Sequence, residues 1–342
     1  MSRPGRASLS TRARAVDLST RARAVDLSTR ARALAVDLST MVGTVSLCTP
    51  VMTASGTAGH GVELAAYGDL SSLGAVVVKS LAAEPWGGNP APRVHEVEAG
   101  MLNSVGLQGP GMAAWIEHDL PKLSAVGATV VASIWGRTVE GFEKAAAMLA
   151  GLSTGERRAL VAVEVNVSCP NVEDRSRMFA HSPTATAEAV DASRCGLPRW
   201  AKLSPNVGDV REIAAAAIGS GAAGLTLVNT LLGMAIDVNR RRPVLGAVGG
   251  GLSGPALHPV AVRAVWECRE AFPEAAIVGV GGVLTARDAV ELLLAGASAV
   301  QVGTASFRDP RAPWKILGGI ERWCARSGVA TVRELVGAGH GG

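Results

Sequence analysis

The segment Val163-Glu164-Val165-Asn166-Val167-Ser168-Cys169-Pro170-Asn171 decides the fold class, because an aliphatic strand in it runs directly into a polar loop. A short aliphatic run is typical of a buried strand, and loops at strand ends often carry function. Proline disfavours helical geometry at the preceding residue, so we expect Cys169 to sit on a rigid, extended turn. The thiol is then either a reactive group at one edge of a barrel or sheet, or a buried and inert cysteine.

Similar aliphatic runs alternate with alanine-rich segments from Val36 onward. We predict eight strands, near residues 50–54, 75–79, 129–134, 162–166, 200–203, 224–229, 276–280 and 299–302. The helices that we predict between them include residues 141–149, 210–218, 259–271 and 286–294. This alternation predicts a (β/α)8 barrel. A doubly wound sheet is the alternative, disfavoured because no G-x-G-x-x-G sequence opens the first βα unit.

Residues 85–109 are rich in proline and glycine and are too long for a simple connection between a strand and a helix. We expect this segment to form an extended lid or hairpin beside the active site.

The amino-acid composition favours some classes of protein over others. Hydrophobic residues make up 48% of the 342 residues and aromatic residues only 4%, which suits helices packed over parallel aliphatic strands. No run of about 18 apolar residues occurs, which argues against a membrane span. The five cysteines are scattered without a C-x-x-C pair, so we expect no disulfide framework, no metal site and a reducing cytoplasm.

The first 35 residues differ from the rest of the chain. The sequence LSTRARAVD, residues 9–17, recurs at residues 18–26 and again, with two extra residues, at 27–37. Eight arginines and two aspartates give residues 1–34 a net charge of +6, so the remainder sums to about −2. We expect residues 1–35 to be a disordered arm and residues 36–342 to be the catalytic barrel. Binding to nucleic acid and a transit peptide are the alternatives, and we expect neither a nucleic-acid nor a membrane partner.

Polar residues gather at the carboxyl ends of the predicted strands, where barrels of this kind place their functional groups. Lys79 and Ser80 end one strand, and Asn166 ends another and leads to Cys169 and Asn171. Lys202 and the pair Asn229-Thr230 end the next two strands. Together these residues predict a pocket with two cations, several amides and one thiol, suited to a planar, anionic, amide-rich ligand.

Glycines follow the last two predicted strands, in 278–282 (VGVGG) and 300–304 (VQVGT), and a further glycine-rich loop is expected at 249–254 (GGGLSG). Backbone N–H groups in such loops can hold a phosphate. Ordinary tight turns are the alternative. The more specific interpretation is that a phosphate-bearing cofactor binds in the mouth of the barrel.

Several motifs, in order along the chain, resemble the class 1 dihydroorotate dehydrogenases. They are VVKS at 77–80, NSVGL at 103–107, NVSCPN at 166–171, NTLLGMAID at 229–237 and GGGLSGPALHP at 249–259, followed by GVGGV and VGT. The resemblance covers nearly everything from Val36 to the C-terminal region. It implies a barrel that binds FMN and oxidises dihydroorotate to orotate in pyrimidine synthesis.

The resemblance also implies roles for individual residues. Cys169 is the base that removes the C5 proton of dihydroorotate, and Lys202 faces the pyrimidine edge of the flavin. Ser133 stands where many relatives have an asparagine that contacts flavin and substrate, so we expect water to take over that hydrogen bond. The implied flavin-contacting residues are Ser55, Lys79, Ser80, Ser133, Asn166, Lys202, Val228, Gly254, Gly281, Gly282, Gly303 and Thr304. The implied substrate-contacting residues are Lys79, Asn103, Ser104, Val105, Gly106, Leu107, Asn166, Asn171, Asn229 and Thr230.

The pattern is most like class 1B, in which the catalytic subunit pairs with an iron–sulfur and FAD subunit that reaches NAD. We expect such a partner and a homodimer. The alternatives are a fumarate-dependent class 1A enzyme and a dihydropyrimidine dehydrogenase-like subunit. From other classes, the alternatives are a non-redox phosphate-binding barrel and a non-enzymatic protein that binds through its arginine arm.

Overall fold

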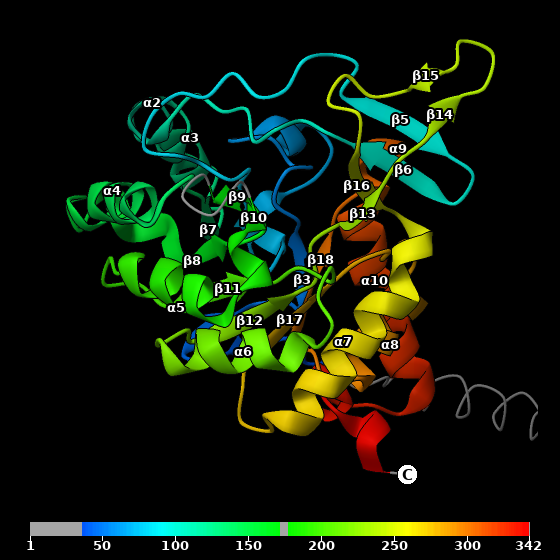
Figure 1. The fold of residues 1–342 in the computed structure, drawn as a ribbon. Helices are drawn as coiled ribbons and strands as arrows, with labels where there is room; N and C mark the ends of the chain where they lie inside the picture. Colours follow the sequence, from blue (N-terminus) through cyan, green and yellow to red (C-terminus); the bar gives the residue numbers. More distant parts are fainter. Residues whose placement is uncertain (1–35, 172–176, 342) are drawn as a thin grey trace, which may run out of the picture.

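An eight-stranded parallel sheet forms the centre of the protein in the computed structural model, which describes residues 36–171 and 177–341 (Figure 1). Its strands are β3 (Val51–Thr53), β4 (Val76–Val77), β7 (Val130–Ile134), β8 (Leu160–Asn166), β11 (Arg199–Lys202), β12 (Gly224–Leu227), β17 (Ile277–Val280) and β18 (Ala299–Val302). The order is β3-β18-β17-β12-β11-β8-β7-β4, and a parallel bridge between Met52 and Ala75 closes the sheet. The predicted (β/α)8 barrel and its eight strands are confirmed.

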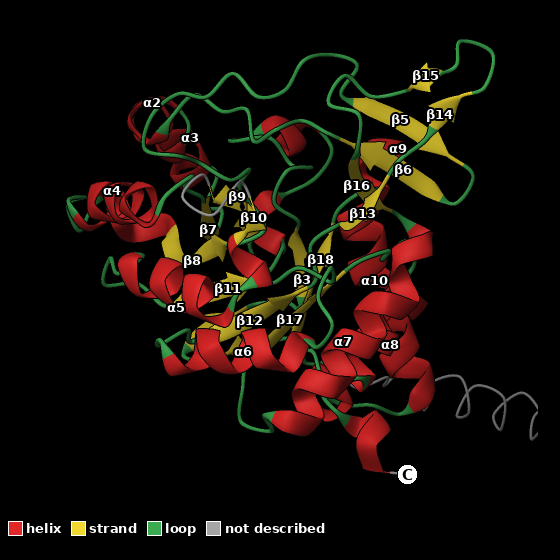
Figure 2. Ribbon diagram, in the orientation of Figure 1, coloured by secondary structure: helices red, strands yellow, loops and turns green. Residues whose placement is uncertain are grey.

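Helices surround the strands (Figure 2). They are α2 (Met112–His118), α3 (Leu120–Ala125), α4 (Val139–Ala150), α5 (Pro183–Ala192), α6 (Val210–Gly219), α7 (His258–Ala271), α8 (Ala286–Leu294), α9 (Ala305–Arg308) and α10 (Ala312–Ser327). The four helices given by residue range in the sequence prediction correspond to α4, α6, α7 and α8. Local caps fix some of the ends: Thr285 and Asp288 form a capping box that starts α8. In the part of the chain that the structure describes, no helix is both long enough and apolar enough to span a bilayer.

The interior of the barrel is layered, because alternate residues of each strand point inward. The lowest layer is apolar and includes Ala162, Trp200 and Val278, which pack against a short hairpin of β1 (Thr40–Val42) and β2 (Val45–Leu47). Two residues further along β8 and β11, the inward positions become Glu164 and Lys202, both almost completely buried. The change from apolar to charged layers places the polar interior directly beneath the carboxyl ends of the strands.

A second, antiparallel sheet lies beyond those ends (Figure 1). It consists of β5 (Val94–Val97), β6 (Gly100–Asn103), β13 (Leu231–Gly233) and β16 (Gly250–Ser253), in the order β13-β16-β6-β5. The lid predicted in residues 85–109 is therefore present as the β5–β6 hairpin. The prediction of a glycine-rich loop at 249–254 is wrong, because residues 250–253 form strand β16. A Cβ atom on Gly100 would lie 2.0 Å from the carbonyl oxygen of Ser253, so only glycine allows this approach of β6 to β16.

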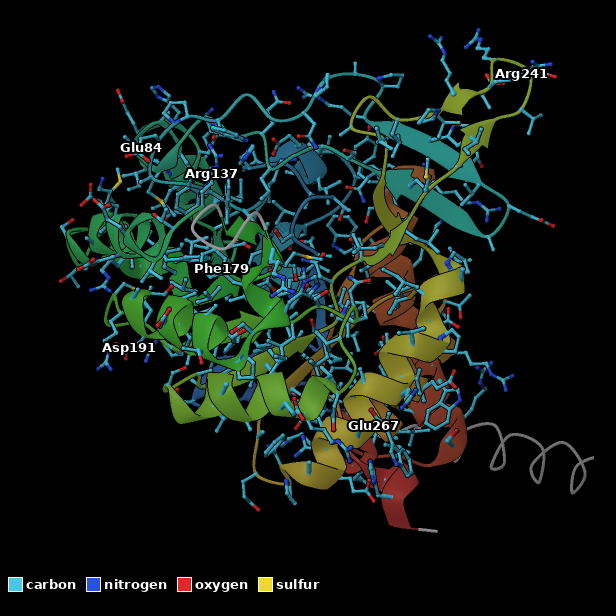
Figure 3. All side chains as sticks on the ribbon, in the orientation of Figure 1. Glu84, Arg137, Phe179, Asp191, Arg241 and Glu267 are labelled. Carbon is cyan, nitrogen blue, oxygen red and sulfur yellow. The ribbon has the colours of Figure 1, made fainter. Side chains whose placement is uncertain are left out.

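The remaining short elements connect these layers. The strands are β9 (Pro170–Asn171), β10 (Arg177–Met178), β14 (Ile236–Asp237) and β15 (Arg242–Pro243). The 3₁₀ turns are Glu63–Ala66, Leu70–Ser72, Glu156–Ala159, Phe179–His181, Pro255–Leu257, Val332–Leu335 and Ala338–Gly341. Figure 3 shows Arg241 near the tip of the ribbon that β14 and β15 form away from the barrel.

Deletion of residues 1–34 is expected to leave the fold intact. The predicted arm lies outside the described residues, but the chain next to it is tied to the C-terminal segment. Asp37 donates its backbone N–H to Ala330 at 2.9 Å, accepts from Val332 at 2.9 Å and pairs with Arg333 at 2.8 Å. Thermal unfolding of the truncated chain should match that of the full chain, and an unfolded truncation would contradict the proposed boundary at residue 36.

Candidate active site

A cavity of about 1580 Å³ lies between the carboxyl ends of the barrel strands and the second sheet. It exceeds the roughly 300–1,000 Å³ typical of a site for one small molecule, so it has room for two ligands together. The residues predicted from the sequence that line it are Ser55, Lys79, Ser80, Asn103, Ser104, Val105, Gly106, Leu107, Asn166, Lys202, Val228, Asn229, Thr230, Gly254, Gly281, Gly282, Gly303 and Thr304. Ser133 and Cys169 do not belong to this lining.

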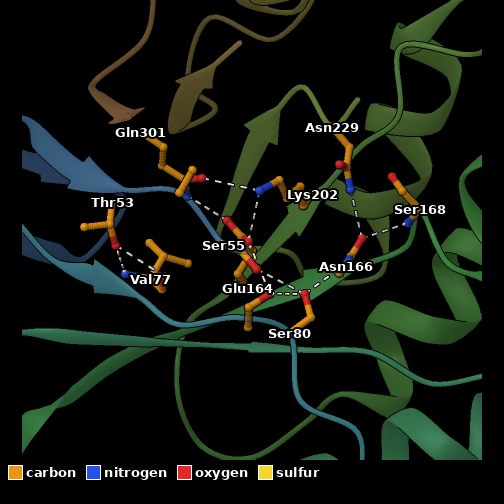
Figure 4. A network of polar contacts seen from close by, with 12 residues as sticks. Thr53, Ser55, Val77, Ser80, Glu164, Asn166, Ser168, Lys202, Asn229 and Gln301 are labelled. Carbon is orange, nitrogen blue, oxygen red and sulfur yellow. Dashed lines mark hydrogen bonds and ion pairs between the residues drawn. The ribbon is translucent and has the colours of Figure 1, made fainter. Parts of the chain in front are cut away.

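The floor of the cavity is a buried polar network (Figure 4). The carboxylate of Glu164 accepts a hydrogen bond from the amide of Gln301 at 2.7 Å and from the ammonium group of Lys202 at 3.4 Å. Lys202 also donates to Gln301 Oε1 at 3.4 Å. Glu164 is completely buried and Lys202 is 4% exposed, so each charge depends on the other for compensation. This pairing keeps the ammonium group of Lys202 fixed at the bottom of the cavity.

Carboxamides from the ends of β8 and β12, the two strands on either side of β11, meet beside this floor. Asn229 donates to Asn166 Oδ1 at 3.2 Å, and Asn166 donates in turn to Ser80 Oγ at 3.1 Å. Asn229 Oδ1 accepts from the backbone N–H of Thr230 at 2.9 Å. These contacts join the ends of three barrel strands, β4, β8 and β12. They hold several amide donors and acceptors in one orientation, as recognition of a ring with carbonyl and N–H groups requires.

Lys79 supplies a second cation at the wall of the cavity. Burial is the main cause that lowers the pKa of its ammonium group, and the positive charge of Arg93 lowers it further. Among the described residues, none accepts a hydrogen bond from Lys79 Nζ, so this group can bind an anionic ligand. Arg93 itself donates to the backbone oxygens of Asn89 and Gly87 and orders the lid segment.

Glycines after β17 and β18 form the other end of the cavity, beside the short helix α9. Gly282 has a φ of +66°, and a Cβ atom there would lie 2.7 Å from the Cβ of His258. Thr304, just before α9, donates its hydroxyl to Ser253 at 2.8 Å and so connects this end to the second sheet. Loops after the seventh and eighth strands, with the N-terminus of a short extra helix, are the usual phosphate site of such barrels.

The structure does not bring the thiol of Cys169 to the cavity wall. The residue is completely buried, and its Sγ lies within hydrogen-bonding distance of the backbone oxygens of Gly136 at 3.1 Å and Asn166 at 3.2 Å. Burial raises the pKa of this thiol to about 12. The adjacent Ser168 lines the cavity instead, with an Oγ that has no partner among the described residues.

Ser133 is also placed differently from the prediction, and Asn171 is described by its backbone alone. Ser133 is completely buried one layer below the cavity, where its hydroxyl bonds to Ser80 and Glu164. Asn171 forms part of β9, whose partner is β10, and its side chain lies outside the described part of the chain.

Three residues of the site were missed in the sequence. Glu164 and Gln301 form the floor, and Asn206 accepts from the backbone N–H of Leu232 at 2.7 Å and donates to the oxygen of Thr230 at 2.9 Å, anchoring β13. A signal for the first two was available, since each is a polar residue at an inward position of an otherwise aliphatic strand. For Asn206 the sequence offers none, because the residue lies in a loop and its contacts are with the separate segment 230–232.

Fold and site together define a class: a (β/α)8 barrel with a lid, whose large cavity combines two lysines and several carboxamides with glycines at its other end. Comparison with known proteins identifies a family within this class. The family model described as dihydroorotate dehydrogenase matches residues 37–323. The chain is 49% identical over 297 residues to the dihydroorotate dehydrogenase B (NAD(+)) catalytic subunit of Desulforudis audaxviator, covering 86% of this chain and 95% of that protein. The protein of the same name from Geotalea daltonii is 47% identical over 294 residues, covering 85% and 94%.

The chain belongs to the dihydroorotate dehydrogenase family. The resemblance found in the sequence motifs is thereby confirmed, and with it an oxidoreductase that uses a flavin. Family membership excludes the two non-redox alternatives, a phosphate-binding barrel without redox chemistry and a non-enzymatic binding protein.

Proposed function

We propose that this chain oxidises dihydroorotate to orotate in pyrimidine synthesis, with FMN as its cofactor, and passes the electrons to NAD through a partner subunit. The observation that carries the proposal is that Lys79, Lys202 and the carboxamides line the same cavity as the glycines that follow β17 and β18. The names of the relatives, catalytic subunits of an NAD(+)-linked enzyme, support the same reaction.

The residues present fit FMN. The glycine loops around Gly254, Gly282 and Gly303 offer backbone N–H groups to a phosphate, and the cavity between them and Lys202 is large enough for a tricyclic ring. The buried ammonium group of Lys202 favours an electron-rich ring above it. When bound, FMN supplies the acceptor for the hydride that leaves C6 of dihydroorotate.

The substrate would be held by residues that are already ordered. Asn103, Asn166 and Asn229, with Thr230 and the backbone of residues 104–107, offer donors and acceptors to the ring amides, and Lys79 offers a cation to the carboxylate. Asn103 is fixed by its own hydrogen bond to the oxygen of Gly251 at 3.2 Å, which links the substrate pocket to the lid. Rigid donors of this kind orient the substrate without a further loss of freedom.

Cys169 remains our proposed base for the C5 proton. To act, its Sγ must leave the oxygens of Gly136 and Asn166 and turn into the cavity beside Ser168. The same movement would remove the burial that raises the pKa of the thiol, because the thiolate would then face the polar groups that line the cavity. The geometry thus ties formation of a base to a rearrangement of the loop at residues 168–171.

A partner subunit carrying an iron–sulfur cluster and FAD is part of the proposal. The names of the relatives describe a catalytic subunit, which implies a separate electron-transfer subunit. We further propose a homodimer, supported by the apolar side chains exposed along the segment of β13 and β14, Leu232, Met234, Ile236 and Val238. A cytoplasmic location is proposed because all five cysteines are free thiols.

Orotate formation with different electron acceptors tests the proposed function. The FMN-loaded chain alone should not reduce NAD, because no described element offers a dinucleotide site, and adding the partner subunit should give NAD-dependent turnover. Fumarate-dependent turnover of the chain alone would instead support the class 1A alternative. Reduction of uracil or thymine in place of dihydroorotate oxidation would support the dihydropyrimidine dehydrogenase-like alternative.

A further inference from the structure

A chain of three hydroxyl groups connects the buried carboxylate of Glu164 to the cavity (Figure 4). Ser133 Oγ lies 3.3 Å from Glu164 Oε1, Ser80 Oγ lies 2.9 Å from Ser133 Oγ, and Ser55 Oγ lies 3.1 Å from Ser80 Oγ. Ser133 and Glu164 are completely buried, Ser80 is 3% exposed, and Ser55 and Ser80 line the cavity. The chain therefore runs from a charge in the interior to the surface that a ligand would touch.

The charge of Glu164 fixes the direction of this chain. Glu164 forms an ion pair with Lys202 and accepts the N–H of Gln301, and a carboxylate only accepts hydrogen bonds. Ser133 must therefore donate its single hydrogen to Glu164 and can only accept from Ser80. Ser80 then gives its hydrogen to Ser133.

The same count of hydrogens and lone pairs can be made for Ser80 and Ser55, which line the cavity. A hydroxyl has one hydrogen and two lone pairs. Ser80 already accepts from Asn166 Nδ2 at 3.1 Å, so its second lone pair is left for Ser55, and Ser80 is then saturated. Ser55 has donated its hydrogen to Ser80, and only its lone pairs remain for a ligand.

We propose that Glu164 and Ser133 are positioning residues that make Ser55 a hydrogen-bond acceptor only, so that the bound ring presents an N–H group to Ser55. The inference rests on the proposed function, because it concerns the FMN ring. Two ring groups have the required chemistry: N3–H, present in both redox forms, and N5–H, present only in the reduced form. The experiment has one arm for each.

The full-length chain is compared with Ser133→Ala, Ser55→Ala and Thr226→Val. Ser133→Ala removes the acceptor of Ser80, so that the chain can reverse and Ser55 can point its hydrogen into the cavity. Ser55→Ala removes the hydrogen-bond acceptor that faces the cavity. Because it alters only a partly exposed residue, this variant still tests the proposal if Ser133→Ala does not fold. Thr226→Val is the matched control: Thr226 pairs with Lys202 in the barrel register and is completely buried, but its hydroxyl has no partner among the described residues.

The first arm measures the affinity of flavin-free protein for FMN and for N3-methyl-FMN, and the second measures the midpoint potential of bound FMN. If N3–H faces Ser55, the affinity for N3-methyl-FMN should be about tenfold lower than that for FMN in the wild type and in Thr226→Val. In the two serine variants this ratio of affinities should be smaller by a factor of at least three. If N5–H faces Ser55, the affinity ratio of reduced to oxidised FMN should fall about tenfold in the serine variants, a potential lower by about 30 mV.

Unchanged methylation penalties together with unchanged potentials in both serine variants would overturn the inference while leaving FMN as the cofactor. A wild-type chain that fails to bind FMN would instead refute the proposed function, and the ring contact with it.

Discussion

Replacement of Cys169 by alanine is expected to lower the rate of dihydroorotate oxidation by about 10²- to 10⁴-fold at neutral pH, the usual contribution of a positioned general base. The FMN content should not change, because the thiol lies outside the cavity lining. Stopped-flow measurement of flavin reduction, with absorbance to quantify bound FMN, checks both expectations. Ser168→Ala is the neighbouring control, because Ser168 lines the cavity but is not the proposed base. Near-wild-type rates in Cys169→Ala would show that another residue is the base.

The pH dependence of the wild-type rate follows from the same thiol. Only the thiolate can take the C5 proton, and burial raises the pKa of Cys169 to about 12 in the conformation described. The rate should therefore rise with pH, about tenfold per unit, until the pKa of the thiol in the active conformation is reached. A plateau well below pH 12 would report the movement of Sγ into the cavity. A rate that does not change with pH from 6 to 10 would contradict a thiol base.

Glu164→Gln is expected to destabilise the flavin-free protein by about 3–5 kcal/mol, because it leaves the ammonium group of Lys202 buried without its counter-charge. Urea unfolding followed by circular dichroism measures this. Combining Glu164→Gln with Lys202→Met should recover most of the loss, since no uncompensated charge then remains. Glu140→Gln on α4 is the control: its pair with Lys144 is at the surface and should contribute no measurable stability. Equal stability of Glu164→Gln and wild type would mean that Lys202 does not depend on Glu164.

Local patterns were sufficient to predict the barrel. Most of the eight strands are short aliphatic runs, and each is buried along almost its whole length, so the segments could be recognised one at a time. Parallel strands present their carboxyl ends at one edge, and for that reason Lys79, Asn166, Lys202 and Asn229 could be placed in one cavity before their contacts were known.

The remaining features depend on contacts between distant segments. The glycine-rich residues 250–253 resemble a loop in the sequence but form a strand, because β6 lies beside them. The two segments are far apart in the chain, with 148 residues separating the partners Asn103 and Gly251. The role of Glu164 arises from the register that sets Ser133, on β7, beside it, and from Gln301, which is 137 residues away. The orientation of the Cys169 thiol depends on Gly136, which no local pattern in the NVSCPN motif specifies.

Anaerobic mixing of the FMN-loaded chain with dihydroorotate tests the central claim most directly. The proposed chemistry needs only this chain, its flavin and the substrate, so the yellow absorbance should bleach promptly and one orotate should form per flavin, without NAD or a partner subunit. A flavin that stays oxidised under these conditions would contradict the assignment.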